Sequence, residues 1–270
     1  MKPPLSLQMS TTVAQLSKIP ILFLITICAH VSFSPPNAPA LYEEQYRYTA
    51  RRPSRDFLPN IGQWLPCIFK VRLLSNASDL SLPDSSEQYV VHFFNLAEIF
   101  AIIARRYTYS DPTTPSLHAA PARPTHGIHV SASFLFGTFL VSFGTLIRVV
   151  CYRQLGRHFT YELSIQEDHK LVTTGIYSIV RHPSYTGVLL FLFGTALCQR
   201  GEGSWWVEHE VARSGIGQLI GLIWLFAVCG GVALTLSRIR KEDIVLQQEF
   251  PEEWIAWGTL TPYKLIPGLY

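Results

Sequence analysis

Apolar segments alternate with polar stretches along this chain. Five apolar segments cover residues 19–33, 88–104, 130–150, 184–199 and 214–236. Two of them, 130–150 and 214–236, are long enough for a helix rising ~1.5 Å per residue to cross the ~30 Å hydrocarbon core of a bilayer. The pattern predicts an all-α integral membrane protein, a multi-span helical bundle of about five spans.

Polar and small residues inside these segments indicate how the helices pack. Glu98 lies within an apolar segment, and because a carboxylate in the membrane is costly, we expect it to face other helices or water. Gly137 and Gly144 lie seven residues apart in the segment 130–150. Small residues at such positions favour close contact with a neighbouring helix.

The N-terminal third is the least regular part of the chain. Residues 19–33 form a short apolar run, followed by prolines and small residues up to residue 40. This layout fits a cleaved signal peptide, and it equally fits a short first span. We expect a divergent N-terminal region over residues 1–87, with one span or signal-like segment. A membrane domain is expected over residues 88–270, with its core at 130–270.

Composition supports a membrane location. Hydrophobic residues make up 48% of the 270-residue chain and charged residues 15%, against about 25% charged residues in ordinary soluble domains. The net charge of +3 is too small to indicate a nucleic-acid partner. Basic residues gather in the stretch after residue 150 and in the tail, namely Arg153, Arg157, Lys170, Arg181, Arg238, Arg240, Lys241 and Lys264. The positive-inside rule places both groups in the cytosol.

The cysteines and loop histidines do not indicate a metal site or a disulfide framework. The five cysteines lack CxxC spacing, and three of them lie in or at the ends of apolar runs. His118, His126 and His129 lack acidic or cysteine companions nearby in the sequence. We therefore expect no bound metal.

The longest polar stretch between apolar segments runs from residue 156 to residue 187 and holds three histidines and three tyrosines. Pro183 suits the first position of a helix and biases His182 away from helical geometry. The start of that helix favours an anionic ligand group. Tyr177 and Tyr185 flank the turn, and aromatic faces attract cations. Interfacial anchoring is the alternative role for both tyrosines.

Arg238 and Glu242 follow the last apolar segment and lie four residues apart. If the helix continues, their side chains share one face. An ordinary surface ion pair contributing ~0.5 kcal/mol or less is the simpler interpretation of this spacing.

Ordered motifs in these two polar blocks resemble the isoprenylcysteine carboxyl methyltransferase family. The first block reads His169-Lys170-Leu171-Val172, then Gly175-Ile176-Tyr177, then Arg181-His182-Pro183-Ser184-Tyr185-Thr186-Gly187. The second reads Arg238…Glu242-Asp243…Leu246, then Phe250-Pro251-Glu252-Glu253-Trp254, then Thr261-Pro262-Tyr263…Pro267-Gly268. The match covers about residues 130–270, and Asp243 stands where the family is expected to have Glu. Two separated blocks in the expected order make the resemblance specific.

The resemblance implies a multi-pass enzyme of the endoplasmic-reticulum membrane with a cytosol-facing pocket between the two polar blocks. Its cofactor would be S-adenosyl-L-methionine, and it would methylate the C-terminal carboxylate of a farnesylated or geranylgeranylated cysteine after CaaX processing. Prenylated CaaX proteins and the lipid bilayer would be its partners. By the family pattern, the cofactor is held by Gln166, His169, Lys170, Leu171, Val172, Tyr177, His182, Pro183, Ser184, Tyr185 and Glu242. The same pattern implies that Arg238 would be the catalytic residue that binds the substrate carboxylate.

Three other interpretations share part of this pattern. Phospholipid N-methyltransferases share the cofactor and a His-Pro-x-Tyr turn, but their amine acceptor needs a base and has less use for Arg238. Membrane sterol reductases share the Arg-His-Pro-x-Tyr-x-Gly turn, but they carry Asp where this chain has Val188. A non-catalytic scaffold would keep the spans without needing both polar blocks. The combination of motifs favours the carboxyl methyltransferase.

Overall fold

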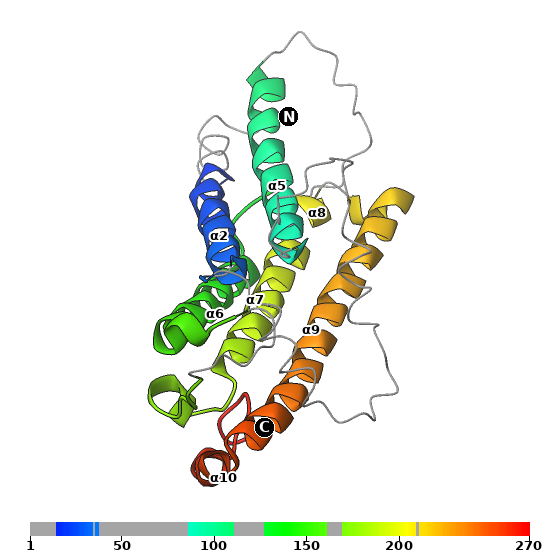
Figure 1. Ribbon diagram of the computed structural model, residues 1–270. Coiled ribbons are helices and arrows are strands. Elements are labelled where there is room, and N and C mark those ends of the chain that lie inside the picture. The colour runs from blue at the N-terminus through cyan, green and yellow to red at the C-terminus, as the bar shows by residue number, and fades with distance from the viewer. Residues whose placement is uncertain (1–14, 35, 38–85, 111–126, 161–168, 209–210) are drawn as a thin grey trace, which may run out of the picture. The chain divides into compact units, whose positions relative to one another are not determined.

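The computed structural model describes residues 15–34, 36–37, 86–110, 127–160, 169–208 and 211–270 (Figure 1). Regular structure in these ranges is helical. The elements in chain order are α2 (Lys18–Phe33), α5 (Ser86–Ser110), α6 (Ala132–Leu155), η1 (Gly156–His158), η2 (Gly175–Ser178), α7 (Pro183–Arg200), α8 (Trp205–Glu208), η3 (Val211–Arg213), α9 (Gly215–Glu249) and α10 (Pro251–Leu260). The prediction of an all-α chain is confirmed for the described residues.

Each of the five apolar segments lies mainly in a helix, and the structure adds two features. α5 continues to Ser110, beyond the end of the apolar segment 88–104. The first proline after residue 104 is Pro112. A proline disfavours helix at the residue before it, so no proline ends the helix before Ser110. The stretch between the apolar segments 184–199 and 214–236 contains the short helices α8 and η3.

Contacts divide the chain into two compact units, and each is described by itself. Unit 1 comprises Met1–His30, Gln88–Phe143 and Leu190–Val228. Unit 2 comprises Val31–Glu87, Gly144–Leu189 and Cys229–Tyr270. These units do not test the predicted division into residues 1–87 and 88–270, which stays a prediction.

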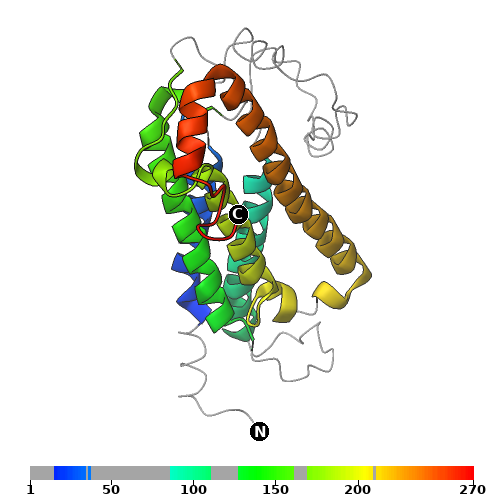
Figure 2. The same ribbon diagram turned by 90° about the horizontal axis from the view of Figure 1, so that it is seen from below.

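Two stretches of helix are long and apolar enough to cross a membrane, judged by length and composition. They are Ala132–His158, which contains α6, and Gly215–Glu249, which is α9. Figure 2 shows α9 as one unbroken helix. Large apolar side chains lie exposed on α9 at helical spacing, namely Ile216, Leu219, Ile223 and Phe226. Such a stripe is unfavourable in water and is well solvated by lipid.

A buried ion pair joins α2 to α5 in unit 1. The Lys18 side chain is 0% exposed and its ammonium pairs with the Glu98 carboxylate. The same ammonium donates to the Gly203 carbonyl at 2.8 Å and lies 4.3 Å from the centre of the Phe134 ring. Glu98 therefore faces other helices, as predicted for a carboxylate within an apolar segment.

Glycines bring α6 and α7 close together within each unit. In unit 1, a Cβ at Gly194 would lie 2.6 Å from the Gly137 carbonyl oxygen. In unit 2, a Cβ at Gly187 would lie 2.7 Å from the Gly144 carbonyl oxygen. No side chain fits at these separations, which confirms the predicted role of small residues in close helix packing.

The ion pair leads to a test of stability. Glu98→Gln should destabilise the protein by about 3–5 kcal/mol, because it leaves the Lys18 ammonium buried without a counter-charge. The double variant Lys18→Met/Glu98→Met should recover most of this loss. Thermal unfolding in detergent micelles measures both effects, with the exposed Glu202→Gln as the matched control. A double variant that is less stable than Glu98→Gln would contradict the ion-pair assignment.

Candidate functional site

The first turn of α7 begins as the sequence predicts. Pro183 is the first residue of the helix. The His182 carbonyl accepts hydrogen bonds from the amides of Tyr185 at 3.1 Å and Thr186 at 3.3 Å. Proline suits this position because the amide it lacks would have no partner inside the helix. The His182 ring is thereby placed directly before the helix start.

The C-terminal tail folds back onto this turn in unit 2. The amide of Arg181 donates to the Tyr263 carbonyl at 2.9 Å, and the amide of His182 donates to the Lys264 carbonyl at 2.8 Å. The Thr186 hydroxyl donates to the Leu265 carbonyl at 2.8 Å. These bonds satisfy backbone groups that precede the helix and fix the tail beside them.

Asp243 is the central charge of this region. Its Oδ1 accepts from His182 Nε2 at 2.8 Å, and its Oδ2 lies 2.9 Å from the Lys264 ammonium and 3.8 Å from Arg181 Nη1. Since a carboxylate only accepts, Nε2 of His182 carries the proton in this bond. Nδ1 of the same ring lies 3.8 Å from Glu242 Oε2. Asp243 therefore sets the orientation of the buried His182 ring.

Four predicted site residues come together in unit 2. The Tyr185 hydroxyl donates to Glu242 Oε2 at 2.8 Å and is within hydrogen-bonding reach of the Arg238 guanidinium. The Tyr185 ring stacks on the His182 ring at 5.8 Å between centroids. α9 continues through Arg238 and Glu242, so the two lie one turn apart on a common face as predicted. The simpler alternative of an isolated surface ion pair does not describe this arrangement.

His169 adds a polar group beside Glu242. Its ring centroid lies 5.1 Å from that of His158 and 5.9 Å from that of Phe250. Burial lowers the pKa of His169, the neighbouring His158 lowers it further, and Glu242 raises it in part. His169 Nδ1 is buried without a hydrogen-bond partner among the described residues. A buried polar atom of this kind fits a site that receives a polar ligand.

Three predicted residues form the apolar support of the site. Leu171 and Val172 pack against a buried cluster of Cys151, Tyr177 and Trp257. The Tyr177 carbonyl accepts from Trp257 Nε1 at 3.0 Å, and burial raises the pKa of the Tyr177 hydroxyl. Their side chains pack into the protein, and their predicted contact with a cofactor stays a prediction.

The remaining predicted residues are spread over different environments. Lys170 is exposed and Pro183 is buried. The Ser184 hydroxyl accepts from Arg148 Nη1 at 3.1 Å, which ties the start of α7 to α6. Gln166 lies outside the described residues.

The structure adds residues that the sequence-based site omitted. Asp243 occurs in the quoted motifs and Lys264 among the basic residues of the tail, yet neither was assigned a role in the site. Asp243 follows Glu242 directly, and adjacent helical residues point in different directions, so spacing gave no reason to place both at one site. The buried Arg148 lies near the end of the apolar segment 130–150, where a lone charge is a signal for a polar contact.

Comparison with known proteins agrees with the motifs. Residues 137–201 match the model of the isoprenylcysteine carboxyl methyltransferase (ICMT) family. Protein-S-isoprenylcysteine O-methyltransferase B of Arabidopsis thaliana is 44% identical over 131 residues, which is 47% of this chain and 56% of that protein. Protein-S-isoprenylcysteine O-methyltransferase of Dictyostelium discoideum is 38% identical over 136 residues, 50% of this chain and 49% of that protein. Protein-S-isoprenylcysteine O-methyltransferase of Rattus norvegicus is 28% identical over 139 residues, which is 48% of this chain and 39% of that protein.

The chain spans about half the length of these curated relatives. The family match includes the whole of the first polar block, from His169 to Gly187. The geometry brings this block together with Arg238 and Glu242 of the second. The resemblance of this chain to the isoprenylcysteine carboxyl methyltransferase family is confirmed.

Proposed function

We propose that this chain is a protein-S-isoprenylcysteine O-methyltransferase. It transfers a methyl group from S-adenosyl-L-methionine to the C-terminal carboxylate of a farnesylated or geranylgeranylated cysteine in CaaX-processed proteins. One observation carries the proposal: Tyr185 and Glu242, which are 57 residues apart in the sequence, share a hydrogen bond that Arg238 also approaches. The Arg238 cation and the Glu242 carboxylate therefore lie together beside the His-Pro-Ser-Tyr turn of the family motif.

Arg238 suits the binding of the acceptor carboxylate. A C-terminal carboxylate has a pKa of about 3.3–3.7 and is therefore ionised at neutral pH, so its methylation requires no general base. The acceptor needs to be held in line and kept away from water. A guanidinium offers a fork of donors that matches both carboxylate oxygens. An amine acceptor would instead be repelled by this side chain while protonated, which disfavours phospholipid N-methylation.

Glu242 and His169 suit the binding of the methyl donor. S-adenosyl-L-methionine supplies a methyl group bound to a positively charged sulfur, and it carries an ammonium group. Glu242 is 33% exposed, and its Oε2 accepts from Tyr185. A carboxylate with a second oxygen can still accept from that ammonium. The lowered pKa of His169 keeps this ring neutral near pH 7, so it adds no repulsive charge and leaves the buried Nδ1 to face a ligand.

Asp243 acts as a positioning residue in this proposal. It accepts from His182 and neutralises Arg181 and Lys264, so it keeps the turn, α9 and the tail in register. The His182 ring in turn supports the stacked Tyr185. A shift of this carboxylate would therefore move the hydroxyl that joins Arg238 and Glu242.

The proposed enzyme is a multi-pass protein of the endoplasmic-reticulum membrane. We assign α2, α5, α6, α7 and α9 as its five spans. The basic residues of both polar blocks put the active site on the cytosolic side by the positive-inside rule. Substrate proteins carry their CaaX cysteine on that side, and the prenyl chain enters from the bilayer between the helices. A site at the membrane surface suits an acceptor that carries both an apolar prenyl chain and a charged carboxylate.

Arg238→Ala should lower kcat/KM by about 10- to 100-fold, because a charge-assisted hydrogen bond contributes ~1.5–3 kcal/mol. Membranes that contain the chain are given labelled S-adenosyl-L-methionine and N-acetyl-S-farnesylcysteine, and base-labile methyl ester is measured. The matched control is Arg240→Ala, since Arg240 is exposed two residues further along α9. Methylation of phosphatidylethanolamine in place of the prenylcysteine would contradict the proposal.

Glu242→Gln should raise the KM for S-adenosyl-L-methionine by about tenfold, because loss of one charged hydrogen bond costs ~1.5 kcal/mol or more. The KM for N-acetyl-S-farnesylcysteine should change much less. Initial rates at varied concentrations of each substrate separate the two constants, with the exposed Glu253→Gln as control. Equal increases in both constants would reject the assignment of Glu242 to the cofactor.

Asp243→Asn should destabilise the protein by about 3–5 kcal/mol, because it leaves Arg181 and Lys264 without their shared counter-charge. Asp243→Glu should retain most of the stability, since it keeps the charge that the family motif has at this position. Thermal unfolding measures the stability. A lower kcat with unchanged KM values would show the loss of positioning. The exposed Glu252→Gln serves as control. Full stability of Asp243→Asn would show that the carboxylate does not hold this region together.

A further inference from the structure

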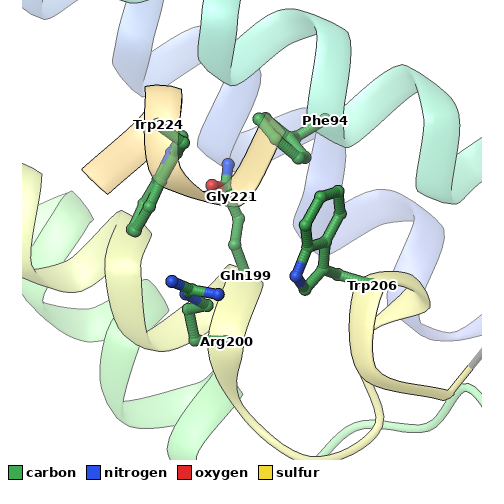
Figure 3. Close-up of a pocket in the computed structure, with 6 residues that line it drawn as sticks. All are labelled: Phe94, Gln199, Arg200, Trp206, Gly221 and Trp224. Carbon is green, nitrogen blue, oxygen red and sulfur yellow. The ribbon is translucent and has the colours of Figure 1, made fainter. Parts of the chain in front are cut away.

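The hollow in unit 1 is too small to bind a substrate or a lipid. It has room for about one water molecule and is lined by Phe94, Gln199, Arg200, Trp206, Gly221 and Trp224 (Figure 3). In unit 2, by contrast, a buried polar side chain contacts a residue of the proposed cofactor site, because Arg148 bonds to Ser184.

Arg148 is buried inside an apolar stretch of helix. Its side chain is 3% exposed. It belongs to the stretch Ala132–His158, which is apolar enough to cross a membrane. A charged side chain in such a stretch is costly, so its presence indicates a specific role. A guanidinium also brings five N–H donors, and burial requires acceptors for them.

One set of contacts joins Arg148 to the end of α2. Its Nε donates to the Ser32 carbonyl at 2.8 Å, and the Tyr152 hydroxyl donates to the same carbonyl at 2.6 Å. Ser32 lies in the last turn of α2, where carbonyl groups lack partners inside the helix. The guanidinium carbon lies 5.7 Å from the centre of the Phe33 ring. A cation is favourable at this end of a helix, so Arg148 stabilises the last turn of α2.

Further hydrogen bonds fix the same end of α2 in unit 2. The Ser32 hydroxyl shares a hydrogen bond of 2.9 Å with the Thr145 hydroxyl. After the helix, the side-chain amide of Asn37 donates to the carbonyls of Gly156 at 2.8 Å and Phe159 at 2.7 Å. The end of α2 is thus bound to α6 and to the η1 turn that follows it.

A second set of contacts joins Arg148 to the first turn of α7. Its Nη1 donates to the Ser184 hydroxyl at 3.1 Å and lies 3.5 Å from the Ser184 carbonyl. A Cβ at Gly187 would lie 2.8 Å from Cγ of Arg148, so the arginine stem passes α7 where only glycine leaves space. Ser184 directly precedes Tyr185, whose hydroxyl donates to Glu242. A shift of Arg148 would therefore move the turn that carries Tyr185.

We propose that Arg148 is a positioning residue for cofactor binding, and that it acts by holding the first turn of α7 to the end of α2. Arginine suits this role because its fork reaches Ser32 through Nε and Ser184 through Nη1. The inference rests on the proposed function, because it concerns the binding of S-adenosyl-L-methionine.

The inference gives the divergent N-terminal region a role in the site. α2 lies outside residues 137–201, which match the family model. The sequence left open whether this segment is a cleaved signal peptide or a first span. Because Ser32 belongs to α2, the support of α7 by Arg148 requires α2 to remain in the mature protein.

The test measures the affinity of the purified full chain for S-adenosyl-L-methionine in detergent micelles by titration calorimetry. Arg148→Met keeps a long side chain and removes the donors, so it should raise the Kd about tenfold, as expected for lost hydrogen bonds of a charged group. The KM for N-acetyl-S-farnesylcysteine should change much less. The matched control is Arg153→Met, which replaces an exposed arginine of the same helix.

The Kd separates positioning from a merely structural role. A structural role would lower the unfolding temperature and the yield of active protein but leave the Kd of the folded protein unchanged. An unchanged Kd in Arg148→Met, with the parent chain binding S-adenosyl-L-methionine, would overturn this inference alone. A parent chain that binds no S-adenosyl-L-methionine would overturn the proposed function as well.

Two more variants test the path through Ser184. Ser184→Ala removes the acceptor, so Arg148→Met should raise the Kd much less in that background than in the parent chain. Equal effects in both backgrounds would overturn the path through this turn. Arg148→Lys serves if Arg148→Met does not fold, because it keeps the cation but loses the fork. It should also weaken cofactor binding, and an unchanged Kd would overturn the inference.

The retention of α2 is tested by the intact mass of the chain purified from eukaryotic membranes. The mass should include residues 18–33. A mature chain that begins after residue 40 and binds S-adenosyl-L-methionine as tightly as the full chain would overturn the role of α2.

Discussion

The carboxylate of Asp243 is the interaction on which the proposed site depends. A buried charge is costly unless partners surround it. Here the partners are the His182 ring, the Lys264 ammonium and the Arg181 guanidinium. They come from the turn before α7 and from the C-terminal tail, while Asp243 itself lies on α9. One carboxylate thus requires three separate stretches of chain to be in place at once, and that requirement fixes the geometry around Tyr185 and Glu242.

Close packing of α6 against α7 gives this arrangement a rigid base. In unit 2 the backbone at Gly144 approaches Gly187, and Arg148 of α6 bonds to the Ser184 hydroxyl. The first turn of α7 is therefore held both by α6 and by the tail. A methyl transfer that needs no general base depends mainly on such rigidity, because its rate follows from how well the acceptor is oriented.

The polar groups inside unit 1 fall into two kinds. Lys18 and Glu98 form a closed pair that satisfies both charges. Trp206 Nε1 and Gln199 Oε1 are buried without hydrogen-bond partners among the described residues. The first kind is explained by helix association in an apolar environment.

The sequence by itself determined the helices, the two stretches that are apolar enough to cross a membrane, and most of the residues that meet at the proposed site. A helix in lipid must satisfy its own backbone groups, so local hydrophobicity is enough to locate it. The Pro183 start and the Arg238–Glu242 spacing are local patterns of the same kind. Only the tertiary structure decided that Lys264 meets Asp243, that Tyr177 faces the interior, and that Gln199 and Trp206 share a hollow. These contacts depend on backbone hydrogen bonds and packing between distant segments, which no local pattern of residues specifies.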